Sequence, residues 1–191
     1  MRRPKGTSGV ATSAAALTAA ARVAGGEPHD LLRAICGVAN GPVSVEVTAG
    51  DRDGMLREAR AWAAVAAAVI VKVPFTNAGI EVVRACAAEQ IRTVVGACPS
   101  PEQALLAARA GAAYVAAPVG RVDGVDGNDV IRKLVALFKT YGFSTQIVAG
   151  GIRLPTDVID AALAGAHAAA APAAVVRELD AESTRQADGR G

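Results

Sequence analysis

The chain has 191 residues, enough for one domain with a sizeable core, and a composition of 52% hydrophobic but only 3% aromatic residues predicts a core of small aliphatic side chains. A net charge of +2 gives no sign of a nucleic-acid or membrane-surface partner, and no run reaches the ~18 apolar residues of a membrane span. The three cysteines form no short pairing motif, so they favour a reducing compartment and argue against a metal site of the zinc type.

Apolar, β-branched runs alternate along the chain with segments of helical periodicity. The predicted strands cover residues 42–48, 68–74, 91–98, 113–118, 145–149 and 166–171, and residues 9–13 are a candidate seventh strand. The predicted helices cover residues 53–67, 77–89, 100–110, 129–141 and 155–164, and one more begins near Ala14. Asn77 and Ser100 are the expected caps of two of these helices, and Gly142 closes a third.

This regular order of strand and helix predicts an α/β fold with a parallel sheet, either open and doubly wound or closed into a barrel. The short, even units favour a TIM-type (β/α)₈ barrel. Seven strands are one short of a complete barrel, and residues 1–8 are too short and polar to supply the missing first strand. We expect a disordered segment over 1–8, the incomplete barrel over 9–179 and a frayed tail over 180–191.

The N-terminus resembles an export signal only loosely. Arg2 and Arg3 precede an alanine-rich stretch, but Thr12, Ser13 and Thr18 dilute its apolar character and no clear cleavage motif follows. We therefore expect a cytoplasmic protein.

Lys72 is the one charge in the apolar strand 68–74. A buried ammonium is costly unless it is paired or loses its proton, and a neutral amine is a nucleophile that forms a Schiff base with a carbonyl. The alternative is a lysine near a strand end whose amine reaches solvent. Glu46, near the end of the preceding strand, is either a proton-transfer group or the ion-pair partner that keeps Lys72 charged and structural.

Two arginines also follow predicted strands. Arg121 comes after the strand at 113–118, and Arg153 after the strand at 145–149. Chemistry in a barrel of this type belongs at the carboxyl ends of the strands, so we expect Lys72, Glu46, Arg121 and Arg153 to converge on one face. Guanidinium groups match the geometry of phosphate oxygens, so the functional hypothesis is a phosphate-binding site. The alternative is that both arginines are ordinary surface residues.

Several segments together resemble the small transaldolase family, which includes the fructose-6-phosphate aldolases. They are GPVSVEV (41–47), VIVKVP (69–74), QALLAARAGA (103–112), YV (114–115), VGRVD (119–123) and AALAGA (161–166), in family order and spacing. The resemblance implies a barrel in which Lys72 is the Schiff-base lysine, Glu46 works through a water, and Arg121 and Arg153 hold the substrate phosphate. It implies transfer or aldol release of a dihydroxyacetone unit between sugar phosphates, a reaction of the pentose phosphate pathway, with no metal and no cofactor.

The chain departs from the family pattern at several polar positions. It lacks the opening strand that ends in an aspartate, and Val94 and Gly96 stand where the family has Asn-x-Thr. Ala116 and Gly151 replace serines, and the family's Thr-Thr-Asn-Pro-Ser turn reads ATSAA at 11–15. These losses leave two alternatives open. The protein is an impaired relative that binds sugar phosphate or acts as a scaffold, or the chain is part of a longer gene product that supplies the missing strand. The exposed strand edges of an incomplete barrel predict a homo-oligomer.

Overall fold

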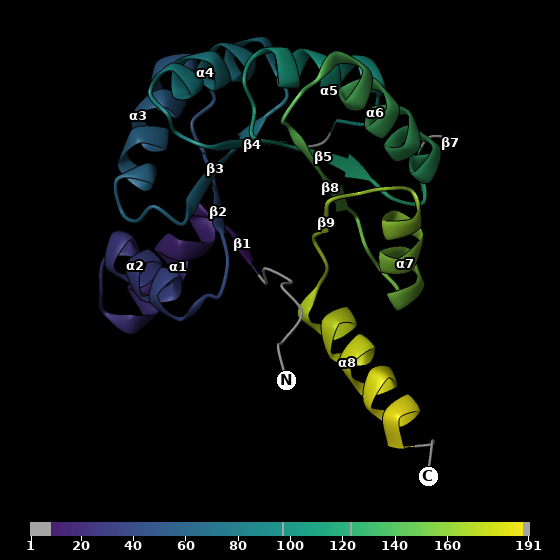
Figure 1. The fold of residues 1–191 in the computed structure, drawn as a ribbon. Coiled ribbons are helices and arrows are strands. Elements are labelled where there is room, and N and C mark those ends of the chain that lie inside the picture. Colours follow the sequence, from purple (N-terminus) through teal and green to yellow (C-terminus); the bar gives the residue numbers. More distant parts are fainter. Residues whose placement is uncertain (1–8, 97, 123, 189–191) are drawn as a thin grey trace. The chain divides into compact units, whose positions relative to one another are not determined.

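The computed structural model describes residues 9–96, 98–122 and 124–188, so the segment 1–8, for which we expect disorder, lies outside the described residues. The chain divides into two compact units, Met1–Gly96 with Arg109–Ala113, and Ala97–Ala108 with Tyr114–Gly191. In each unit, parallel strands alternate with helices along the chain (Figure 1).

The first unit contains four parallel strands in the order β1-β2-β3-β4. They are β1 (Val10–Ser13), β2 (Val43–Glu46), β3 (Val69–Pro74) and β4 (Thr93–Gly96). Its helices are α1 (Ala14–Ala24), α2 (Pro28–Val38), α3 (Arg52–Ala63) and α4 (Asn77–Ala88). The candidate strand at 9–13 is therefore confirmed as β1, and the sequence analysis missed α2.

The two faces of this four-stranded sheet differ in burial, because successive side chains of a strand point to opposite faces. Val45, Val71 and Val73 are fully buried, and α3 and α4 pack against β3 on this side. A Cβ built on Gly79 of α4 would lie 3.2 Å from Cγ1 of Val73, which fixes the direction of that valine. We call this the helix-covered face. The side chains that alternate with these valines along the strands, among them Glu46 and Lys72, point to the opposite face of the sheet, which we call the open face.

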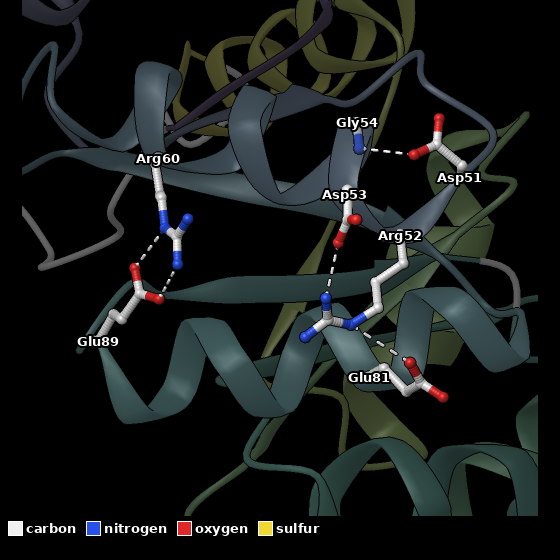
Figure 2. A network of polar contacts seen from close by, with 7 residues as sticks. All are labelled: Asp51, Arg52, Asp53, Gly54, Arg60, Glu81 and Glu89. Carbon is white, nitrogen blue, oxygen red and sulfur yellow. Dashed lines mark hydrogen bonds and ion pairs between the residues drawn. The ribbon is translucent and has the colours of Figure 1, made fainter.

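Ion pairs on the surface join α3 to α4 (Figure 2). Arg60 donates two hydrogen bonds to the carboxylate of Glu89, at 2.8 and 2.6 Å, and this contact holds the pKa of Glu89 below its usual value. Arg52 lies 3.3 Å from Glu81. Asp51 caps α3 by accepting a 2.8 Å hydrogen bond from the backbone N–H of Gly54. The side chains of these pairs are exposed, so each pair contributes little to stability.

The second unit contains three parallel strands in the order β5-β8-β9, namely β5 (Tyr114–Pro118), β8 (Gln146–Gly150) and β9 (Ala168–Ala169). Between β5 and β8 the chain forms a small antiparallel pair, β6 (Arg121–Val122) with β7 (Val125–Asp126). The helices are α5 (Pro101–Arg109), α6 (Gly127–Tyr141), α7 (Pro155–Leu163) and α8 (Ala173–Asp188). Helix α6 packs on β5 and β8 and buries Ile131, Leu134 and Phe138.

In the described residues, seven parallel strands alternate with helices, which is the topology of an incomplete TIM-type barrel, so the predicted fold class is confirmed. The β6–β7 pair was not predicted, because two-residue strands carry no periodicity. No helix in the described part of the chain is long and apolar enough to cross a membrane. Helix α8 runs through residue 180, where the expected tail begins.

Several predicted details of the helices were wrong. Thr76 caps α4 in place of Asn77, because its hydroxyl accepts a 2.9 Å hydrogen bond from the backbone N–H of Gly79. Helical spacing in the sequence places Val83 and Ala87 on the inward side of α4. Val83 is buried, but Ala87 is exposed and Cys86 is buried instead. Helix α3 ends at residue 63 instead of 67, since the chain must turn there to enter β3.

Candidate active site

The register of the first unit places four side chains in one row across the open face. Ser13 pairs with Glu46, Glu46 with Lys72, and Lys72 with Val94. Glu46 is the last residue of β2, and Lys72 lies two residues before the end of β3. The row therefore lies near the carboxyl ends of the strands, where barrel enzymes carry their chemistry.

Lys72 and Glu46 form a direct ion pair. Nζ of Lys72 lies 3.2 Å from Oε2 of Glu46, and the two side chains are 36% and 39% exposed. The lysine is thus paired and partly solvated, in a strand whose neighbouring residues Val71 and Val73 are fully buried. A carboxylate at this distance can act as an ion-pair partner or as a proton acceptor, so the two roles inferred from the sequence both stay predictions.

Gly96 lies beside the lysine stem, in register with Pro74. A Cβ built on Gly96 would come within 2.8 Å of Cε of Lys72, closer than carbon atoms approach without a shift of one of them. Val94, the direct register partner of Lys72 on the same strand, is 9% exposed. The β4 side of the lysine is therefore apolar and has no side chain at position 96.

A carboxylate that the sequence analysis missed fastens the loop after β2. Glu58 of α3 accepts hydrogen bonds from the backbone N–H of Thr48 at 2.7 Å, from the Thr48 hydroxyl at 3.0 Å and from the N–H of Ala49 at 3.1 Å. The backbone N–H of Val47 donates to the carbonyl of Lys72 at 3.1 Å. Nothing in the sequence distinguishes Glu58 from other charged residues of α3, because its role depends on a contact between a helix and a loop.

The two predicted phosphate ligands belong to the second unit. Arg121 opens β6, and its backbone pairs with Asp126. Arg153 is exposed just before α7, and its backbone N–H donates a 2.7 Å hydrogen bond to Asp157. That bond and the one from the N–H of Leu154 hold the pKa of Asp157 below its usual value. The convergence of these arginines with Lys72 and Glu46 stays a prediction.

Other groups in the described residues offer no rival centre. Within residues 9–96, 98–122 and 124–188, no group of His, Cys, Asp and Glu side chains could hold a metal ion. Cys98 is fully buried, and burial raises the pKa of its thiol to about 12. A thiol in that state is a small core side chain and a poor nucleophile.

Comparison with known proteins points to one family. The family described as Transaldolase/Fructose-6-phosphate aldolase matches residues 14–189. A probable transaldolase of Sorangium cellulosum (strain So ce56) is 47% identical over 147 residues, which is 76% of this chain and 68% of the relative. Probable transaldolases of Anaeromyxobacter sp. (strain Fw109-5) and Bacillus thuringiensis subsp. konkukian (strain 97-27) are 42% identical over 152 residues and 45% over 153. The two alignments cover 78% and 79% of this chain and 71% of each relative.

Proposed function

The chain belongs to the transaldolase/fructose-6-phosphate aldolase family, and on that premise we propose that it acts on sugar phosphates through a Schiff base on Lys72. The reaction is transfer of a dihydroxyacetone unit to an acceptor aldehyde, or its release by aldol cleavage. The observation that supports this most is the ion pair of Lys72 and Glu46, a partly exposed amine 3.2 Å from a carboxylate at the carboxyl ends of parallel strands.

The amine must first lose a proton, and Oε2 of Glu46 is close enough to Nζ to accept it. The neutral amine adds to the ketose carbonyl, and loss of water leaves a protonated imine. The neighbouring carbon–carbon bond then breaks as the hydroxyl beyond it loses its proton. The electron pair moves toward the imine nitrogen, so an aldehyde departs and an enamine remains on Lys72.

The enamine has two fates, which define the two activities. Attack of its carbon on an acceptor aldehyde forms a new carbon–carbon bond, and hydrolysis then releases the product ketose and the free amine. Protonation of the carbon followed by hydrolysis releases dihydroxyacetone instead. In both, we propose that Glu46, through a water, moves the protons at the reacting oxygen and carbon atoms.

Borohydride trapping tests the Schiff base. Reduction in the presence of fructose 6-phosphate should leave a stable adduct on the peptide that contains Lys72, as mass spectrometry detects. Lys72→Met should abolish the adduct. Lys133→Met should leave it intact, because Lys133 is an exposed lysine paired with Asp129 in the second unit. Glu46→Gln should slow trapping by about 10²–10⁴-fold. An unlabelled Lys72 in the native chain would refute the proposal.

We further propose that Arg121 and Arg153 bind the substrate phosphate. The support is their place in the segments that follow β5 and β8, and the match of guanidinium groups to phosphate oxygens. Arg153→Ala should raise KM for a sugar phosphate and leave the reaction of unphosphorylated dihydroxyacetone unchanged. Arg132→Ala, on the exposed side of α6, is the matched control. An equal effect of Arg153→Ala on both substrates would argue against phosphate binding.

A second function is an impaired relative that binds sugar phosphate or serves as a scaffold. Val94 and Gly96 favour it, because neither offers a hydroxyl or amide to orient a water beside Lys72. Robust turnover that disappears in Lys72→Met would exclude this function. Saturable binding of fructose 6-phosphate with neither turnover nor trapping would establish it.

We also propose a cytoplasmic homo-oligomer. Among the described residues, β1 pairs on one side only, with β2, and Val10 at its start is 41% exposed. An unpaired strand edge is a site where another chain adds or covers. Light scattering coupled to gel filtration should give a mass of at least two chains, and a monomer at micromolar concentration would contradict the assignment.

A further inference from the structure

Gly96 leaves space beside Lys72 and does not have the positive φ that favours glycine. The glycines with positive φ lie elsewhere in the described chain, and Gly96 is not among them. An ideal Cβ at position 96 would lie 2.8 Å from Cε of Lys72, 3.7 Å from Nζ and 3.8 Å from Cγ. The lysine stem therefore crosses the place that a side chain at position 96 would occupy.

The lysine is held between two neighbouring strands. On the β2 side, Glu46 contacts Nζ at 3.2 Å, and on the β4 side the stem rests against the backbone of Gly96. Lys72 pairs in register with Val94, so its stem leans two residues along β4 toward the carboxyl end of the sheet. A Cβ at position 96 would push the stem away from β4 and move the amine.

We propose that Gly96 is a positioning residue for Lys72, and this inference rests on the proposed Schiff-base function of that lysine. Because position 96 has no side chain, the Lys72 amine can lie where it contacts the Glu46 carboxylate. A displacement of a reacting group by about 1 Å can lower a rate by about 10²-fold. We therefore expect Gly96→Ala to slow Schiff-base formation about 10- to 100-fold. Threonine, which the family pattern has at this position, would meet the stem in the same place, so Lys72 would need another rotamer beside it.

A spectroscopic measurement tests the position of the lysine without any reaction. In the full chain labelled with [ε-¹³C]lysine, the Lys72 signal is assigned from its loss in Lys72→Met. Gly96→Ala should shift the Lys72 signal and leave those of Lys133 and Lys139 unchanged. Gly150→Ala is the matched control, because a Cβ on that strand glycine would meet its nearest atom at an ordinary 3.8 Å. An unshifted Lys72 signal in Gly96→Ala overturns the inference.

A stability cycle gives a second readout that needs neither activity nor a fully native variant. Alanine loses less backbone freedom than glycine on folding, so it is favoured where its Cβ fits. Gly96→Ala should therefore raise the urea midpoint in a Lys72→Ala background, where the stem is gone. With Lys72 present, the same change should lower the midpoint or raise it less. Equal midpoint changes in the two backgrounds overturn the inference.

Trapping separates failure of this inference from failure of the proposed function. If the native chain traps fructose 6-phosphate and Gly96→Ala traps it at the same rate, the inference fails and the Schiff base stands. If the native chain does not trap, the function fails, and the signal shift and the stability cycle still decide whether Gly96 positions Lys72. Gly96→Ala and Glu46→Gln should be non-additive in trapping rate, because both act on the same amine.

Discussion

Replacing Thr93 by valine should stabilise the protein. Thr93 opens β4 and is fully buried, and in the described structure its hydroxyl oxygen has no hydrogen-bond partner. It pairs in register with Val71, so it lies on the helix-covered face, opposite the row that contains Lys72. Valine has the same branched shape, so the substitution removes the hydroxyl without a change in rotamer freedom.

The magnitude follows from the cost of an unpaired group. A buried hydroxyl without a partner costs about 1–3 kcal/mol, and one additional buried methyl group contributes about 0.8 kcal/mol. We expect Thr93→Val to raise the free energy of unfolding by about 1–2 kcal/mol. Thr93→Ser is the matched control, because it keeps the hydroxyl and removes the methyl group, so it should destabilise the protein by about 1 kcal/mol.

Urea unfolding monitored by tryptophan fluorescence measures both changes. Trp62 is the single tryptophan of the chain, is 6% exposed and lies on α3 in the same unit as Thr93. The slope of the transition should stay constant, so that the shift in midpoint reports stability alone. If Thr93→Val were no more stable than the native chain, the Thr93 hydroxyl would have a hydrogen-bond partner, and the reasoning from an unpaired buried group would be wrong.

Three further predictions concern thiols, caps and pH. Burial raises the thiol pKa to about 11 in Cys86 and about 12 in Cys98, so iodoacetamide at pH ~8 should modify both slowly in the native chain and rapidly in urea; fast native modification would contradict their burial. Thr76→Ala should cost about 1 kcal/mol through loss of the α4 cap, with Thr76→Ser close to native in the same urea assay. The Arg60 contact holds the pKa of Glu89 below its usual 4.5, so the stabilisation from this contact is present above pH ~4.5 and is lost as the pH falls through the lower pKa of the folded state. The difference in urea midpoint between the native chain and Glu89→Gln should therefore shrink in acid. A difference that stays constant with pH would refute this.

The alternation of strand and helix in the sequence was enough to predict the fold class, and the resemblance of whole segments was enough to predict the family. Strand and helix repeat in long, periodic segments, and periodicity is the part of folding that local sequence encodes most directly. The same patterns located Glu46 near the end of β2 and Lys72 inside β3, as the structure confirms. They could not reveal the β6–β7 pair, whose strands of two residues are too short to show a pattern.

How the site residues meet depends on the folded sheet. Register across three strands brings Lys72 against Glu46 and lays its stem over Gly96, and no local pattern encodes which residues of neighbouring strands face one another. The three hydrogen bonds of Glu58 to the loop after β2 also depend on tertiary structure, because helix packing brings together residues that lie 9 or 10 positions apart. In the sequence, Gly96 indicated only the loss of the threonine hydroxyl of the family pattern. In the folded sheet, the Lys72 stem lies in the space that a side chain at position 96 would occupy.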